Sequence, residues 1–167
     1  MSFILLFLFP VLMAYAALSD VFTLRLSNRL TLSIFVCFLI VALIVRLPLL
    51  ALAEQVGCGL FMLLVGFGLF SRGWIGGGDA KLLAAIAAWV GWGSLLDFVL
   101  VTAIVGGVLS LLVVQWRRWP LPESLAHRRW LARLHDPKKG VPYGVALAFG
   151  GLHVYPQTAL TLIMLQM

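Results

Sequence analysis

Long apolar runs separated by short polar segments are the feature that most limits how this chain can fold. A transmembrane helix needs roughly 20 mainly apolar residues, and several runs approach that length. The composition agrees, because 63% of the residues are hydrophobic and only 11% are charged, which lies far outside the range of soluble proteins. We therefore expect an all-α fold, a polytopic membrane helix bundle that forms a single domain over residues 1–167. The six predicted transmembrane spans are Phe3–Leu18, Leu30–Leu47, Val56–Phe70, Ala80–Leu96, Phe98–Trp116 and Val141–Met167.

The distribution of basic residues predicts how these spans are oriented. Arg46 is the one Lys or Arg on one predicted side of the membrane, and all the others follow the first, third and fifth spans. Lys and Arg mark cytoplasmic loops, so we expect both termini to be periplasmic. The basic residues on the predicted cytoplasmic side are Arg25, Arg29, Arg72, Lys81, Arg117, Arg118, Arg128, Arg129, Arg133, Lys138 and Lys139.

Most of the positive charge lies in one predicted cytoplasmic loop, residues 115–141. Aromatic residues such as Trp116 and Trp130 alternate there with the charges, which indicates a short helix lying in the lipid headgroup region. Membrane lipid and topology account for the net charge of +6, so we expect no nucleic-acid partner. Direct recognition of a substrate by this loop remains the alternative.

A glycine-rich turn carries one carboxylate to the start of the fourth span. Gly76, Gly77 and Gly78 directly precede Asp79. An ionised Asp costs roughly 2.5–3.5 kcal/mol at mid-bilayer, so such residues usually lie at span ends, face water or take part in chemistry. Asp79 can also simply cap the next helix, because Asp oxygens accept hydrogen bonds from first-turn N–H groups. The glycine run favours a functional site, because a backbone without side chains lets another backbone approach the carboxylate.

A second carboxylate, Asp20, follows the first predicted span. The C-terminus of a helix carries partial negative charge, which makes this an unfavourable position for an acid. Asp20 is therefore a second candidate for a functional carboxylate; the alternative is that it only caps a short helix in the loop. The charge distribution puts Asp20 and Asp79 at the same membrane face, where two helix boundaries can meet in a folded bundle.

Two carboxyl groups in one site cannot easily both ionise, so the pair holds a single proton. That state can hydrolyse a peptide bond. The ionised member activates water, and the protonated member donates to the carbonyl oxygen and later to the leaving amine. No competing site is evident, because Cys37 and Cys58 lie singly in apolar runs and His127, His135 and His153 are scattered. We expect no metal and no cofactor.

Three motifs resemble one protein family. Residues 76–82 fit the pattern G-x-G-D-x-K-L, Asp20 with Asn28 fits a D…N signature, and residues 141–144 fit a P-Y-G helix start. In these motifs the chain resembles the type IV prepilin peptidases, the GxGD membrane aspartyl proteases, and most closely their compact tight-adherence (Flp) pilus branch. It departs from the pattern at Phe22, where many relatives have Arg, and at Ser27, where they have Pro.

The resemblance implies a multi-pass protein of the bacterial inner membrane that removes leader peptides from prepilins and pseudopilins. It implies Asp20 and Asp79 as the catalytic residues. The resemblance also implies that Lys81 takes part in substrate binding; the alternative is that its side chain only reaches toward the membrane interface. The other residues that it implies in substrate binding are Gly76, Gly77, Gly78, Asn28, Pro142 and Tyr143.

Several points stay open at this stage. The chain lacks the cysteine-containing cytoplasmic region of the larger bifunctional relatives, so the resemblance gives no support for N-methyltransferase activity. A homo-oligomer is neither required nor excluded. The alternatives are a presenilin-like intramembrane protease, whose first Asp lies inside a long span, and a non-enzymatic transport or assembly component, which would favour inverted repeats.

Overall fold

The computed structural model describes residues 2–122 and 127–166. Every regular element in these two stretches is helical, which confirms the predicted all-α class. The elements are α1 (Ser2–Thr23), α2 (Asn28–Ile44), α3 (Leu49–Ser71), α4 (Gly77–Val90), the 3₁₀ turn η1 (Trp92–Ser94), α5 (Leu95–Trp116), α7 (Arg129–His135), α8 (Tyr143–Val154), the 3₁₀ turn η2 (Tyr155–Gln157) and α9 (Ala159–Leu165).

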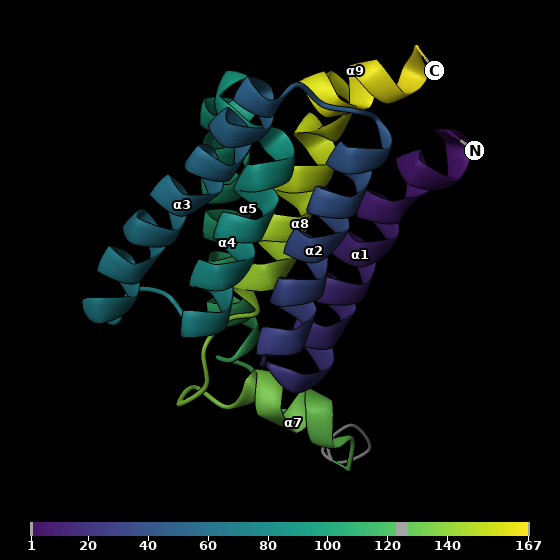
Figure 1. Cartoon of the computed structure of the whole chain (residues 1–167). Coiled ribbons are helices and arrows are strands. Elements are labelled where there is room, and N and C mark those ends of the chain that lie inside the picture. Colours follow the sequence, from purple (N-terminus) through teal and green to yellow (C-terminus); the bar gives the residue numbers. More distant parts are fainter. Residues whose placement is uncertain (1, 123–126, 167) are drawn as a thin grey trace.

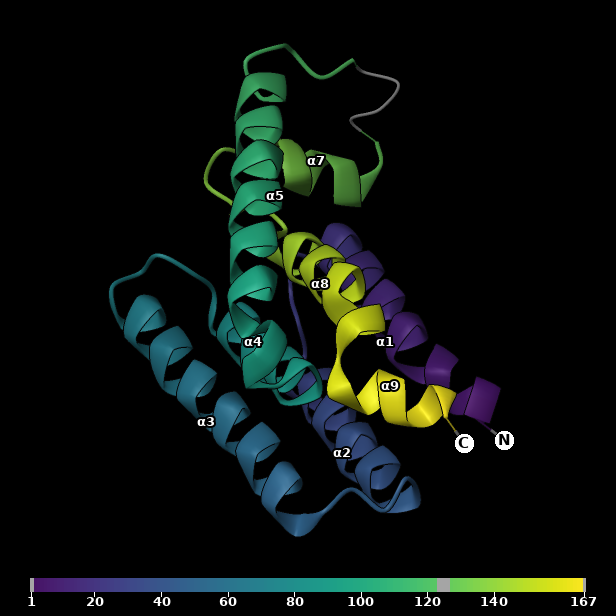
Figure 2. The same ribbon diagram turned by 90° about the horizontal axis from the view of Figure 1, so that it is seen from above.

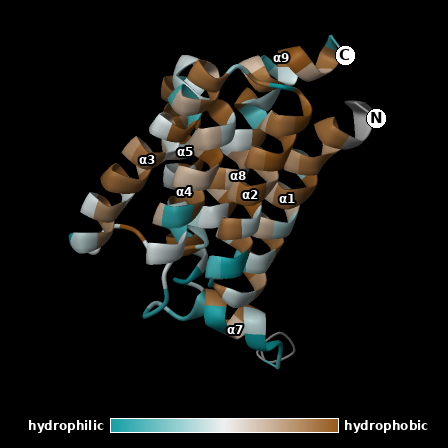
Figure 3. Ribbon diagram, viewed as in Figure 1, coloured by the Kyte–Doolittle hydropathy of each residue, from teal (hydrophilic) through white to brown (hydrophobic). Residues whose placement is uncertain are grey.

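The long helices run alternately up and down the bundle (Figure 1). The connecting segments 24–27, 72–76, 117–122 and 136–142 all lie at one end, together with α7. The opposite end holds the connection at 45–48, α9 and both ends of the chain. Hydrophilic residues gather at the α7 end, and hydrophobic residues follow the helices (Figure 3). The bundle therefore has one polar end, which we call the α7 end.

Within residues 2–122 and 127–166, three helices are long and apolar enough to cross a membrane. They are Leu5–Thr23, Leu49–Ser71 and Trp92–Trp116, and Asn28–Ile44 is a shorter apolar helix. At about 1.5 Å per residue, α4 and α8 fall short of a 30 Å hydrocarbon core. The structure thus supports a membrane bundle, and the number of spans and their orientation stay predictions.

Helix α4 lies at the centre of the bundle. Residues 82–90 are all buried, and α4 contacts α2, α3 and α8 (Figure 2). A helix that is apolar all round suits such a position. Its contact with α3 depends on glycine: a Cβ on Gly59 would lie 3.1 Å from the Ala84 carbonyl oxygen, and one on Gly66 would lie 3.1 Å from the Ala80 Cα. Such close approach by small residues is typical of membrane helices.

An aromatic cluster joins α4 to the helices around it. The Trp89 side chain is fully buried, and its Nε1 donates a hydrogen bond of 3.0 Å to the Ile34 carbonyl of α2. Phe9 of α1 and Phe38 of α2 pack against the Trp89 ring at 5.0 and 5.9 Å between centroids. The hydrogen bond satisfies the indole N–H, as a buried Trp requires.

Several helix boundaries correct the sequence prediction: α4 ends at Val90 and not at Leu96, and α5 starts at Leu95 and not at Phe98. Helix α1 continues past Leu18 to Thr23, so Asp20 lies in its last turn and not in a loop. The helix ends at Leu24, whose φ of 50° cannot continue it. Helix α3 starts at Leu49, directly after Pro48 and well before Val56, because proline is readily accepted at a helix start.

The last predicted span is interrupted. Helix α8 ends at Val154, a 3₁₀ turn contains Pro156, and the separate helix α9 follows. Proline has no N–H to donate and clashes with the preceding turn, so it breaks the helix here. By contrast, Pro10 is accepted inside α1. The predicted end of the span at Met167 lies outside the described residues, as do residues 123–126 of the basic loop.

Candidate active site

Asp79 is held by its own turn. Gly76 is the N-cap of α4, and Gly77 and Gly78 form the first helical turn with Asp79. The Asp79 Oδ2 accepts a hydrogen bond of 3.3 Å from the Gly76 N–H. Asp79 is therefore the third residue of the helix and not the N-cap itself, but its carboxylate does cap the turn by accepting the N–H of the N-cap residue. Its carboxylate lies where the partial positive charge of a helix N-terminus favours an anion.

Asp20 is held by a residue far away in the sequence. Its side chain is only 4% exposed, and its Oδ2 accepts a hydrogen bond of 2.7 Å from the Gly144 N–H. Gly144 lies in the first turn of α8, so the N-terminus of α8 provides the favourable electrostatic environment that the C-terminus of α1 lacks. This arrangement removes the electrostatic problem that the sequence raised for Asp20.

One cavity at the α7 end contains both carboxylates. Its volume is about 1110 Å³, and Asp20 and Asp79 both line it. The glycine turn from Gly73 to Gly78 lines the same cavity. Within the described residues, each carboxylate accepts one hydrogen bond through Oδ2, and Oδ1 accepts none. Each Asp thus keeps an oxygen atom for a water molecule or a substrate.

The glycine run does allow a backbone to approach closely. A Cβ on Gly78 would lie 3.0 Å from the Leu26 Cβ and 3.1 Å from the Leu26 carbonyl oxygen. Leu26 belongs to the connection between α1 and α2, so part of the space that Gly78 leaves is taken by this chain itself. Gly76 and Gly77 line the cavity beside it.

Two predicted substrate-binding residues contact each other directly. The Lys81 Nζ donates a hydrogen bond of 2.6 Å to the Asn28 Oδ1, which joins the first turns of α4 and α2. Asn28 also lines the cavity. Lys81 does not, and instead lines a second pocket between α2, α3 and α4. Both side chains are exposed, so this bond bridges helices at the edge of the site.

The P-Y-G segment lies beside Asp20. Tyr143 lines the cavity and its ring lies against Gly106 of α5, where no larger side chain would fit. Pro142 is buried at the N-cap position of α8 and does not line the cavity. The residue of this motif that touches a carboxylate is Gly144, which the sequence did not single out for that contact.

Arg117 is a further residue of this region that sequence reasoning treated only as a topology signal. Its Nε and Nη atoms donate hydrogen bonds to the carbonyls of Leu134, Lys139 and Gly140 at 2.9, 3.1 and 3.0 Å. Gly140 lines the cavity. The Arg117 side chain thus ties the chain between α7 and α8 to the end of α5. A lone Arg at the end of an apolar run gives no signal of such a role.

The fold and the site define a class: an all-helical membrane-type bundle with two carboxylates in one cavity at its polar end. Residues 7–111 match the type IV leader peptidase family, which is more than half of the chain. The chain belongs to that family. The matched stretch contains Asp20 and Asp79 and ends before the P-Y-G segment. The predicted family is therefore confirmed.

Curated relatives carry the name prepilin leader peptidase/N-methyltransferase. The protein of Dickeya chrysanthemi is 41% identical over 64 residues, 38% of this chain and 23% of the relative. That of Pectobacterium carotovorum is 45% identical over 58 residues, 35% and 21% of the two chains. That of Burkholderia pseudomallei is 39% identical over 77 residues, 46% and 20%. The chain thus spans about a fifth of the length of these relatives. No solved structure matches it.

Proposed function

We propose that this protein is an aspartic endopeptidase that removes the leader peptide from type IV prepilins and pseudopilins of the Flp type. The family match and the names of the curated relatives support prepilin processing. The Flp branch rests on the motif resemblance. The substrate is a membrane-anchored precursor, and the reaction is hydrolysis of one peptide bond at the cytoplasmic membrane face.

Asp20 and Asp79 activate water as a pair. One carboxylate is ionised and takes a proton from water, which attacks the scissile carbonyl carbon. The other is protonated and donates its proton to the carbonyl oxygen. When the C–N bond breaks, a proton passes to the nitrogen of the leaving amine. The Gly76 and Gly144 N–H groups each hold one oxygen and fix the carboxylates during this exchange.

One observation carries this proposal: two acids 59 positions apart in the sequence line the same cavity. A carboxylate in a membrane bundle is costly to keep, so two of them in one cavity favour chemistry. The cavity lies where the chain carries most of its Lys and Arg, which supports a cytoplasmic location. With six spans and periplasmic termini, a leader would be cut on the cytoplasmic side of the inner membrane.

Replacement of either acid tests the mechanism. We expect Asp20→Asn and Asp79→Asn each to lower cleavage of a prepilin by at least about a thousand-fold, because the amide can neither take nor give the proton. The purified protein in detergent is incubated with prepilins, and released leader is measured. Asp97→Asn is the matched control, since Asp97 is exposed in the first turn of α5 at the opposite end.

The outcome that contradicts the dyad is specific. Cleavage by either active-site variant at the rate of the Asp97→Asn control would exclude a two-carboxylate mechanism. A correctly folded variant is required for this comparison, so each variant is checked for membrane insertion and for an unchanged unfolding temperature.

A further inference from the structure

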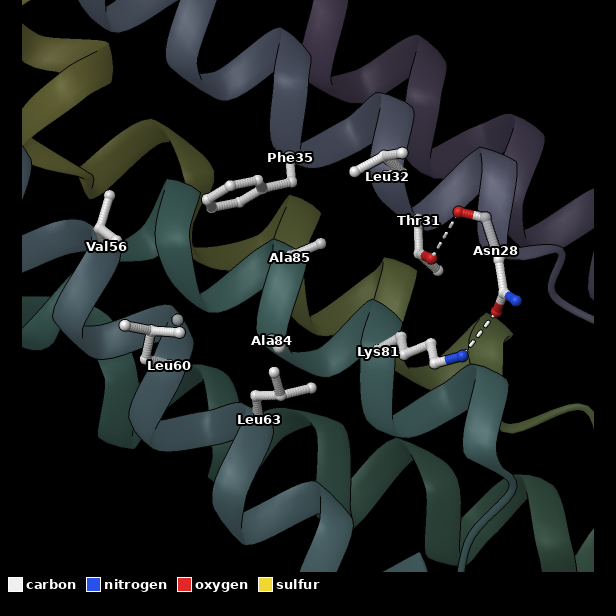
Figure 4. A pocket seen from close by; sticks show the side chains of 11 residues that line it. Asn28, Thr31, Leu32, Phe35, Val56, Leu60, Leu63, Lys81, Ala84 and Ala85 are labelled. Atoms are coloured by element: carbon white, nitrogen blue, oxygen red, sulfur yellow. Dashed lines mark hydrogen bonds between the residues drawn. The ribbon is translucent and has the colours of Figure 1, made fainter.

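An apolar groove runs along α2, α3 and α4 and has a volume of about 380 Å³ (Figure 4). On α2 it is lined by Asn28, Thr31, Leu32 and Phe35. These positions follow the spacing i, i+3, i+4 and i+7, which is one face of a helix over two turns. At 1.5 Å per residue the groove extends about 10 Å along α2.

The opposite wall has the same spacing. Val56, Gly59, Leu60 and Leu63 of α3 line the groove at i, i+3, i+4 and i+7. Leu60 is 57% exposed, so the wall is open to the surroundings of the bundle. The groove therefore runs parallel to the helix axes between two walls, which is the shape that accepts another helix.

The floor is made of small residues. Ala84 and Ala85 of α4 lie between the two walls (Figure 4). Small side chains at a membrane helix contact let two backbones approach closely. One end of the floor is polar, because Lys81 lies one turn before Ala84 and donates its hydrogen bond to Asn28.

The groove adjoins the cavity that holds the two carboxylates. Asn28 lines both spaces, and the Lys81–Asn28 hydrogen bond lies at their junction. A chain bound in the cavity can thus continue past Asn28 into the groove. Inside a bilayer such a chain must be helical, because its backbone has no water to bond.

We propose that this groove seats the apolar helix that continues from the scissile bond of the substrate. The inference rests on the proposed function and adds where the membrane-embedded part of the substrate docks. Side chains along one face of that helix fill the space between Leu32 and Leu60, above Ala84 and Ala85. A lipid chain would fill the groove too, but it has no need of the peptide-sized cavity that adjoins it.

Photo-crosslinking tests occupancy without depending on turnover. The full chain carries Asp79→Asn, so that substrate is retained, and p-benzoylphenylalanine replaces Leu60 in the groove or Leu100 on α5. Leu100 is the matched control, since it is 50% exposed and lies outside the groove. In vesicles that contain a prepilin, we expect the probe at position 60 to label the precursor at least about ten-fold more than the probe at position 100.

Three outcomes separate this inference from the proposed function. Equal labelling at both positions, or labelling of lipid alone, while the native chain cleaves the precursor, overturns the groove and leaves the peptidase intact. Labelling of a second copy of this chain overturns it too. Labelling of the precursor at position 60 without cleavage by the native chain supports the groove and contradicts the peptidase.

Blocking the groove provides a second measurement. Leu32→Trp and Leu60→Trp add bulk to its two walls, and Leu100→Trp is the control on α5. Each variant is assayed with a whole prepilin and with a short peptide that ends soon after the scissile bond. We expect kcat/KM for the whole prepilin, divided by kcat/KM for the short peptide, to fall about ten-fold in the groove variants alone, which is equal to about 1.4 kcal/mol. An unchanged ratio in both groove variants would exclude the docking site.

Discussion

The two carboxylates are held in different ways by two regions of the molecule. Asp79 is bound by Gly76, three residues earlier in the same turn, and the contact is exposed. Asp20 is bound by Gly144, 124 residues later, and the contact is buried. Yet both carboxylates end beside a helix N-terminus, of α4 in one case and of α8 in the other. The site therefore uses the same electrostatic device twice, once within a single turn and once across the bundle.

This difference predicts unequal tolerance to change. The Asp79 turn is half-buried and borders the cavity, so its carboxylate has space to shift. The Asp20 side chain is only 4% exposed and accepts its hydrogen bond from the backbone of α8, so it has less freedom to shift. We therefore expect substitutions near Asp20 to have the larger effect on activity.

Gly144→Ala tests the long-range contact and has the largest expected effect among the substitutions around the two carboxylates. A Cβ there would lie 2.7 Å from the Asp20 Oδ2 and 3.1 Å from its Cβ, so α8 or the carboxylate must move. A displacement of about 1 Å can lower a rate about 100-fold, and we expect a loss of that size in prepilin cleavage. The initial cleavage rate in detergent measures it.

A matched glycine controls for the added methyl group. Gly107→Ala in α5 meets nothing within 4 Å and is expected to leave the cleavage rate unchanged. If Gly144→Ala cleaved as fast as Gly107→Ala, the Asp20–Gly144 contact would have no part in holding the site.

The same contrast separates what the sequence predicts from what it does not. The Asp79 turn is readable because its glycines, its acid and the following helix are neighbours in the sequence. The hydrogen bond from Gly144 to Asp20 is not readable, because nothing local indicates which helix N-terminus faces an acid in α1. The P-Y-G segment pointed to the right region, but by family resemblance and without its partner.

Long-range contacts also explain the errors in the helix boundaries. The polar residues around Asp20 resemble a loop, but they belong to α1, where the Asp20 carboxylate is bonded to α8 and Ser19, Asp20 and Thr23 line the cavity. The role of Arg117 was missed for the same reason, since its three acceptors lie 17 to 23 residues further on. Of the glycines in α3, Gly59 and Gly66 pack closely against α4, whereas Gly57 and Gly68 have nothing within 4 Å, and the sequence alone does not distinguish the two pairs.

Gly76→Ala tests the local contact and is expected to have an intermediate effect. A Cβ there would lie 2.8 Å from the Asp79 Oδ2, which can turn away into the cavity. We expect the cleavage rate to fall about ten-fold, less than for Gly144→Ala, because only one flexible side chain must move. Gly68→Ala, in open space on α3, is the control. A greater loss from Gly76→Ala than from Gly144→Ala would reverse the comparison.

The smallest expected effect belongs to the Lys81–Asn28 pair at the edge of the site. Both side chains are exposed, so water competes for their hydrogen bond of 2.6 Å. A double-mutant cycle of Lys81→Met and Asn28→Ala, read from the free energy of unfolding in detergent, is expected to give a coupling of about 0.5–1 kcal/mol. Arg29→Met is the control for loss of a neighbouring exposed cation.

The cycle tests whether Lys81 only reaches toward the membrane interface, the alternative that the sequence offered, or joins α4 to α2 through Asn28. If Lys81 only reaches the membrane interface, Lys81→Met lowers the free energy of unfolding by the same amount whether Asn28 is present or not, so the coupling is zero. If Lys81 joins α4 to α2, Lys81→Met lowers the free energy of unfolding less in the Asn28→Ala background, because the hydrogen-bond partner of Lys81 is already absent. Such a coupling would mean that Lys81 holds together the two helix starts between which the cavity and the groove meet.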